Sequence, residues 1–258
     1  MTIKIAWFST GSGFGSRNLL EATHSSITQD NLSLHIECVF SNREEREHSG
    51  SDQFFSLVKS LNIPLLTYSS SKFYAQQAKT KETRTRFDEG VIQKLSAFSP
   101  DLVIFAGYKL IVSKKLCDYF TIINLHPALP SGPTGTWQDV IWQLIQCKST
   151  HTGATIHQVT EYLDQGPPIT YFKVPIDTDS FAPLWKDIEG KTIEEIKLRD
   201  GEENALFKAI REAGLKREGH LIVESLRYIA ENPTLLTTLA NRHLTEPISL
   251  TEVIESMA

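Results

Sequence analysis

The sequence has few cysteines and nothing that resembles a disulfide framework or a cysteine-based metal site. Its three cysteines, Cys38, Cys117 and Cys147, are widely spaced and form no C-x-x-C pair. An odd, scattered set of this kind excludes a disulfide-stapled secreted scaffold and suits a reducing cytosol. No metal-ligand cluster is visible, so we expect no metal.

Long apolar runs and an excess of basic charge are also missing. No stretch approaches the roughly 20 apolar residues needed to cross a bilayer, and the short apolar start is followed by glycines rather than a cleavage site. The 26 Lys and Arg residues against 31 Asp and Glu give a net charge of −5. We therefore expect a cytoplasmic protein with no nucleic-acid or membrane partner. The sequence leaves monomer and homodimer open.

What the sequence does contain is an alternation of strand-like and helix-like segments. With 258 residues, 40% of them hydrophobic, the chain can bury a substantial core. The first half predicts strands at 3–8, 34–40, 63–68, 102–106 and 122–125. Helices are predicted between them at 16–27 and 51–61, and a third helix is marked by Phe87, Val91, Leu95 and Phe98. This rhythm predicts an α/β fold, with a Rossmann-like, mostly parallel sheet flanked by helices.

The second half differs, and we place a boundary near residue 176. Residues 137–146 read as a helix, and 152–159 and 169–174 as strands. From residue 177 the chain becomes charged, with helices expected at 194–211 and 220–230 and no core-like strand after Pro233. We therefore predict a catalytic domain over residues 1–176 and a mostly helical C-terminal extension over 177–258 that packs on it.

A glycine-rich turn follows the first strand. Residues 10–18 read Thr-Gly-Ser-Gly-Phe-Gly-Ser-Arg-Asn and open the first helix. Glycines allow tight turns, and a helix start offers free N–H groups to an anion. The spacing is not the G-x-G-x-x-G of a dinucleotide site, and no acidic residue ends the second strand, so a phosphate is favoured over a dinucleotide.

Two further segments lie where the strands of a parallel sheet present their carboxyl ends, which is where ligands bind. Asn124 and His126 are two residues apart on an extended segment, so both side chains point to one side. Asp164 precedes a Gly-Pro-Pro turn, where an aspartate is ordinarily a turn residue. His157 is ambiguous, because it can face solvent or a neighbouring element.

Taken together, these segments resemble the folate-dependent formyltransferase family from about residue 3 to residue 176. The family's Asn-x-His-Pro resembles residues 124–127, its Leu-Asp-x-Gly-Pro residues 163–167, its Gly-x-Gly-Ser-Asn-Leu loop residues 13–19, and its Ala-Gly-aromatic strand end residues 106–108. The first two motifs are fairly specific as a pair, whereas the glycine loop alone is not.

The resemblance implies a formyltransferase fold and transfer of a formyl group from 10-formyltetrahydrofolate to an amine, with glycinamide ribonucleotide of purine biosynthesis as the expected acceptor. Both substrates are small molecules. The implied catalytic residues are Asn124, His126 and Asp164. The implied phosphate-binding residues are Gly13, Gly15, Ser16, Arg17 and Asn18. The implied folate-binding residues are Arg84, Gly107, Tyr108, Lys109, Leu110 and Val112.

The sequence also departs from the family pattern, which leaves the acceptor open. The segment after His126 is shortened, and residues 131–137 lack the family's His-Thr-His. In the family, an acidic residue on a C-terminal helix reaches the nucleotide ribose. The matching position in this sequence is Gly219, or Glu218 if the match shifts by one residue. The alternatives are a formyltransferase that acts on another amine, such as an amino sugar nucleotide, and a non-catalytic binding module on the same scaffold.

Overall fold

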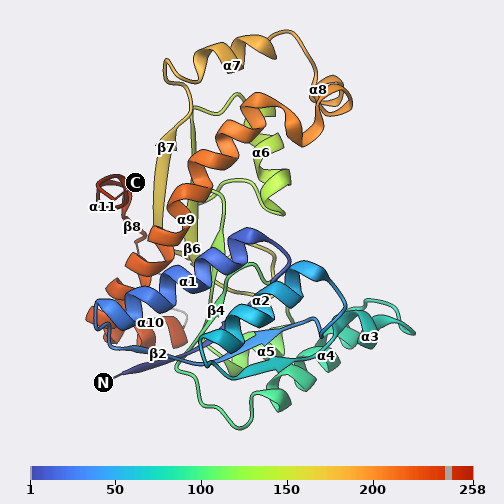
Figure 1. The fold of residues 1–258 in the computed structure, drawn as a ribbon, viewed down its shortest axis with the longest axis vertical. Helices are drawn as coiled ribbons and strands as arrows, with labels where there is room; N and C mark the ends of the chain where they lie inside the picture. Colours follow the sequence, from blue (N-terminus) through green and yellow to red (C-terminus); the bar gives the residue numbers. More distant parts are fainter. Residues whose placement is uncertain (1, 242–245, 258) are drawn as a thin grey trace.

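The computed structural model describes residues 2–241 and 246–257. Within them, eight strands form one sheet in the order β3-β2-β1-β4-β5-β6-β7-β8 (Figure 1). The strands are β1 (Ile3–Phe8), β2 (Leu34–Ser41), β3 (Leu65–Thr67), β4 (Leu102–Phe105), β5 (Ile122–His126), β6 (His151–Gln158), β7 (Pro168–Pro175) and β8 (Ile248–Ser249).

Strand direction confirms the mostly parallel sheet. β3, β2, β1, β4 and β5 pair in parallel, and β6 pairs antiparallel with both β5 and β7. The parallel strands β1 and β4 are almost wholly apolar, because helices cover both of their faces. The carboxyl ends of β1, β4 and β5 therefore meet at one edge of the sheet.

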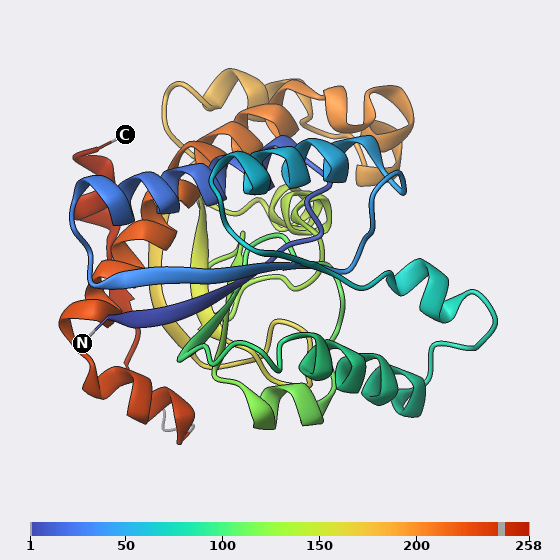
Figure 2. The same ribbon diagram turned by 60° about the horizontal axis from the view of Figure 1, so that its bottom comes forward.

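Helices cover the two faces of the sheet (Figure 2). On one face, α1 (Phe14–Gln29), α2 (Ser49–Ser60) and α9 (Ala205–Glu231) share a hydrophobic core with β1 and β2. On the other face, α4 (Lys81–Lys94) and α5 (Lys114–Tyr119) form a second core with β4. A third core joins α6 (Trp137–Gln146) to α8 (Ile193–Arg199) and the start of α9.

The C-terminal helices correct one expectation. We predicted separate helices at 194–211 and 220–230, but the structure has one 27-residue helix, α9, and a break earlier, at Asp200. α9 continues through Gly214 and Gly219 because its apolar side chains pack on α1 and the sheet along the length of the helix.

Smaller differences concern short elements. The sequence did not predict the short helices α3 (Ser70–Tyr74) and α5, and α2 begins after His48, whose side chain accepts from the N–H of Gly50. After α9 follow α10 (Thr234–Ala240), the two-residue edge strand β8 and α11 (Thr251–Glu255), and α7 (Ala182–Asp187) precedes α8. Over the described residues, no helix combines the length and the apolar character needed to cross a membrane.

Candidate active site

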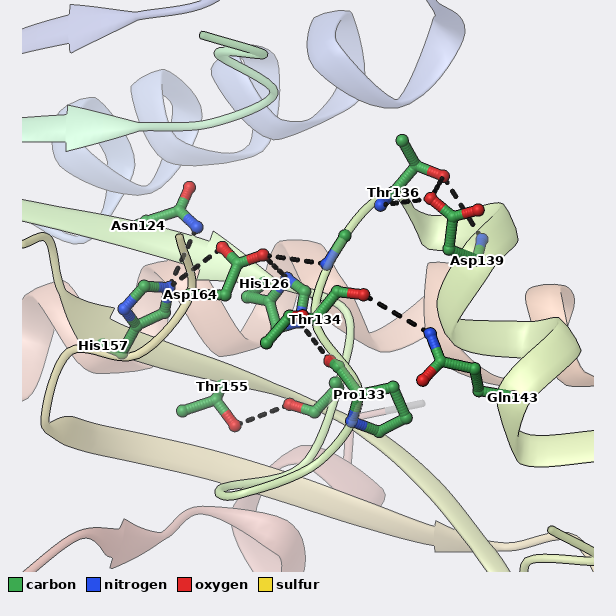
Figure 3. Close-up of polar contacts among 12 residues, drawn as sticks. Asn124, His126, Pro133, Thr134, Thr136, Asp139, Gln143, Thr155, His157 and Asp164 are labelled. Carbon is green, nitrogen blue, oxygen red and sulfur yellow. Dashed lines mark hydrogen bonds and ion pairs between the residues drawn. The ribbon is translucent and has the colours of Figure 1, made fainter. Parts of the chain in front are cut away.

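The end of β5 brings the first two predicted residues together. Asn124 and His126 lie on one side of the strand, and antiparallel pairing sets Asn124 opposite His157 and His126 opposite Thr155 on β6. Asp164 reaches the same place from the loop between β6 and β7 (Figure 3). The three predicted catalytic residues therefore converge, although they come from two segments about 40 residues apart.

Asp164 lies between two imidazole rings. Its Oδ2 is 3.6 Å from Nδ1 of His126, and its Oδ1 is 3.8 Å from Nε2 of His157. Both distances exceed the range of a direct hydrogen bond, so the coupling is electrostatic. All three side chains are at least nine-tenths buried, which strengthens such coupling.

The backbone holds Asp164 in this position. Its φ of 53° is left-handed, a conformation that aspartate tolerates better than most residues, and its Oδ2 accepts a hydrogen bond of 3.1 Å from the N–H of Gly135. The turn then requires Gly166, where a β-carbon would lie 1.6 Å from the carbonyl oxygen of Gln158. The Asp-x-Gly sequence of this turn is therefore a steric requirement.

His157 is the residue that sequence reasoning left undecided. It is 5% exposed, its Nδ1 lies 3.0 Å from the carbonyl oxygen of Gln158, and its Nε2 lies 3.0 Å from Nδ2 of Asn124. Because a carbonyl only accepts, Nδ1 carries the proton and Nε2 accepts from the Asn124 amide. Burial lowers the pKa of His157, which favours this neutral form.

This arrangement fixes the orientation of Asn124. One N–H of its amide is committed to His157, so the second N–H can donate to an oxygen of a bound ligand. The sequence left the direction of the His157 side chain open, because only the register between β5 and β6 sets it opposite Asn124.

His126 is held from the other side by the loop that follows β5. Its Nε2 lies 2.8 Å from the carbonyl oxygen of Pro133 and donates to it, while Nδ1 faces Asp164. Ser131 and Gly135 in this loop have φ values of 61° and 109°. An oxyanion can accept from Nε2 only when it replaces the Pro133 carbonyl.

The glycine-rich turn lies beside the end of β4. Gly11 has a φ of 67°, and α1 begins at Phe14 with Gly13 as an N-cap that has no capping side chain, which leaves the first N–H groups of the helix available. The turn is tied to the end of β4, because the N–H of Thr10 donates to the carbonyl of Gly107 over 3.1 Å. A β-carbon on Gly107 would lie 2.8 Å from Oγ of Ser16.

The segment after β4 carries most of the residues expected to bind folate. Tyr108 and Val112 are buried in the second core, whereas Lys109 is exposed and Leu110 half-buried. Arg84 lies half-buried on α4, which packs against α5 on the same face of the sheet. The structure thus leaves Arg84, Lys109 and Leu110 accessible to a ligand.

Asp88, which sequence reasoning did not single out, anchors this segment. It is 1% exposed, and its Oδ2 accepts a hydrogen bond of 2.5 Å from the N–H of Ser113. Burial raises the pKa of Asp88 to about 6, against the opposing effect of the hydrogen bonds from Ser113 and of the Arg84 charge. Asp88 therefore joins α4 to the end of the segment from 107 to 113.

Glu218 and the other expected binding residues lie around the start of α1. Glu218 is 6% exposed and pairs with Arg211, also on α9, across 2.5 Å. Arg17 points toward α2, with Nη1 3.5 Å from the carbonyl oxygen of Gly50. Within the described part of the chain, no group of three or more His, Cys, Asp and Glu side chains could hold a metal ion.

The chain is similar in sequence to proteins of known family. A family model described as Formyl transferase matches residues 3–184. A phosphoribosylglycinamide formyltransferase of Schizosaccharomyces pombe is 36% identical over 113 residues, 41% of this chain and 55% of that protein. Proteins of the same name from Haemophilus influenzae and Dictyostelium discoideum are 26% and 28% identical over 74% and 71% of this chain, and 81% and 89% of their own lengths.

Solved structures share the fold. Glycinamide ribonucleotide transformylase 1 from Symbiobacterium toebii superimposes with a TM-score of 0.63 at 23% identity, over 90% of this chain and 89% of that one. Phosphoribosylglycinamide formyltransferase from Bacillus halodurans gives a TM-score of 0.61 at 24% identity, over 89% of this chain and 96% of that one. At this identity, the likeness establishes the architecture and confirms the fold predicted from the sequence.

Proposed function

Because the chain belongs to the formyl transferase family, whose model spans residues 3–184, we propose that it transfers a formyl group from 10-formyltetrahydrofolate to the amino group of glycinamide ribonucleotide. The observation that carries this proposal is the convergence of Asn124, His126 and Asp164 at the end of β5. The reaction is a step of purine biosynthesis, and we propose that it takes place in the cytoplasm, which suits the scattered cysteines.

The polar groups at the end of β5 suit the charge that develops during transfer. When the amine nitrogen bonds to the formyl carbon, the carbonyl electrons move onto the formyl oxygen, and donors already in place stabilise that charge. The free N–H of Asn124 is one donor, oriented by His157. His126 supplies a second donor through Nε2 when the formyl oxygen takes the place of the Pro133 carbonyl.

Asp164 completes the proton balance. The attacking amine must lose one proton, and the folate nitrogen must gain one when its bond to the formyl carbon breaks. The Asp164 carboxylate, 3.6 Å from His126, first stabilises positive charge on that ring. It then accepts the amine proton, directly or through one water, and returns it by the same route to the folate nitrogen as the bond to the formyl carbon breaks. Gly135 keeps the carboxylate oriented throughout, through its N–H.

We assign the formyl donor to the segment after β4. Its residues suit a flat aromatic molecule with a carboxylate tail: Leu110 is half-buried and Ile111 is 41% exposed, so both offer apolar surface, and Lys109 and Arg84 offer positive charge. Tyr108 and Val112 support the segment from the core, and Gly107 provides the turn with a φ of 77°.

We assign the acceptor's phosphate to the turn that opens α1. The backbone N–H groups of Gly13, Gly15 and Ser16 are the donors, and Asn18 lies one turn further along the helix. The support for this assignment is the uncapped start of a 16-residue helix beside the end of β4. Arg17 contributes charge at longer range, since its guanidinium is turned toward Gly50.

The test is a steady-state assay with 10-formyltetrahydrofolate, followed by the absorbance of the folate product. Glycinamide ribonucleotide should be formylated faster than an amino sugar nucleotide. Replacing His126 by Ala should lower turnover about 10²- to 10³-fold, as loss of one oxyanion donor does elsewhere. His35→Ala, which changes an exposed histidine on β2, is the matched control. Absence of transfer to any amine would refute the proposal and favour a non-catalytic module.

A further inference from the structure

The continuous helix α9 places two opposite charges on one face. Arg211 and Glu218 are seven residues apart, about two helical turns, so their side chains lie on the same side. Nη1 of Arg211 donates to Oε1 of Glu218 over 2.5 Å, and the side chains are 21% and 8% exposed. A buried carboxylate is costly to leave unpaired, so Glu218 holds the arginine firmly.

A second contact, with an aromatic ring, restrains the Arg211 guanidinium. Cζ of Arg211 lies 4.8 Å from the ring centroid of Trp137, the first residue of α6. Trp137 follows directly on the loop whose Gly135 holds Asp164. Arg211 therefore packs on the same loop and helix start that hold the Asp164 carboxylate.

The remaining edge of Arg211 faces the glycine turn. Nη2 lies 3.9 Å from the point where a side chain would begin on Gly15, so glycine leaves open space between them. Among residues 2–241 and 246–257, Nη2 makes no hydrogen bond. A donor edge thus stays available beside the free N–H groups that open α1.

Arg17 does not occupy this position. It is two residues from Gly15, which is a rotation of roughly 200° around a helix. Its guanidinium is directed to Gly50 at the start of α2. The arginine that faces the Gly15 side of α1 comes from α9, nearly 200 residues later in the chain.

On the basis of the proposed function, we infer that Arg211 binds the phosphate of the acceptor through Nη2. The phosphate receives backbone N–H groups from α1 and a charge-assisted hydrogen bond from the arginine. Arg211 also lies between the phosphate position and the buried Glu218 carboxylate, and its positive charge offsets the repulsion between these two anions.

Calorimetry with two ligands tests this assignment without relying on turnover. Glycinamide ribonucleotide and its dephosphorylated riboside differ only in the phosphate. The dissociation constant of the riboside divided by that of the ribonucleotide therefore measures what the phosphate contributes to binding. Arg211→Ala should reduce that ratio about 10- to 100-fold, and Arg211→Lys should reduce it less. Arg217→Ala is the matched control, since Arg217 lies on the same helix, similarly buried, and pairs with Glu255.

A double variant separates contact from charge balance. In Arg211→Ala combined with Glu218→Gln, no carboxylate is left unpaired, so the chain should fold even if the single variant does not. If Arg211 contacts the phosphate, the ratio stays low in the double variant. A ratio restored to the wild-type value would mean that Arg211 only neutralises Glu218, and the assignment would be wrong.

Two further outcomes also overturn the inference. One is equal weakening of both ligands by Arg211→Ala, and the other is a loss of the same size in Arg217→Ala. The proposed function is judged separately, by the formyl-transfer assay on the wild-type protein. Wild-type transfer to glycinamide ribonucleotide with an unchanged ratio in Arg211→Ala would leave the function standing and remove Arg211 from phosphate binding.

Discussion

Asp88 offers a quantitative test of how the segment after β4 is held. The carboxylate is 1% exposed, and burial raises its pKa from 3.8 to about 6 while its Oδ2 accepts from the N–H of Ser113. In Asp88→Asn the amide oxygen can still accept from Ser113, but no charge is buried. The variant therefore separates the cost of the charge from the value of the hydrogen bond.

The sign of the effect follows from which state binds the proton more tightly. With its pKa raised in the folded protein, Asp88 stays protonated on folding between pH 3.8 and about 6, whereas the unfolded chain releases the proton. The folded state therefore loses stability at this site as the pH rises through that interval. The two pKa values differ by about 2 units, which corresponds to about 3 kcal/mol across the full titration.

The measurement is the free energy of unfolding in urea at several pH values. Because all other groups titrate alike in both proteins, the difference between Asp88→Asn and the wild type isolates this site. That difference should become more favourable to the variant by about 2 kcal/mol between pH 4.5 and pH 7.5. An unchanging difference, or one of opposite sign, would show that burial of this charge does not weaken the folded state.

Asp200 provides the matched control. Its pKa is lowered to about 2, chiefly by hydrogen bonds from Arg199 and Asn204. Both the folded and the unfolded pKa values of Asp200 therefore lie below pH 4.5, so the carboxylate is ionised in both states over the measured range. Asp200→Asn should give a difference from the wild type that does not vary with pH there.

Three further changes test the candidate site. Asp164→Asn keeps the size of the side chain but removes the charge 3.6 Å from His126, so turnover should fall at least about 100-fold with little change in substrate binding, whereas a merely structural turn residue would be nearly silent. His157→Phe removes the acceptor that orients Asn124 and should lower turnover in single-turnover kinetics. Because burial lowers the pKa of His157, the wild type should keep this acceptor to a lower pH than an ordinary histidine would, and should lose turnover only when the ring is protonated there. Gly166→Ala should lower the melting temperature sharply, because a β-carbon there would lie 1.6 Å from a backbone carbonyl oxygen, and an unchanged melting curve would show that the turn is not sterically constrained.

Elements whose signals are local could be predicted from the sequence alone. Alternation along residues 122–126 was enough to place Asn124 and His126 on one side of a strand, because side chains on a strand repeat every second residue. The apolar runs predicted β1, β4 and β5, and the glycines predicted the turn before α1. These features depend on neighbours in the chain, so a single sequence contains them.

Other features depend on which distant segments meet, and these became visible only in the folded chain. The role of His157 follows from the antiparallel register that sets it opposite Asn124. The orientation of the His126 ring depends on the Pro133 carbonyl, which the loop after β5 brings to its Nε2. The burial of Asp88 likewise comes from α4 packing against the segment that ends at Ser113.

The long helix α9 shows the difference most clearly. Read locally, Gly214 and Gly219 lower helix propensity, and the sequence between two amphipathic stretches predicted a break. Packing of its apolar side chains on α1 and the sheet outweighs that local cost, so one helix forms. Its continuity is what aligns Arg211 with Glu218 and directs the arginine to the start of α1, which no local pattern in the sequence specifies.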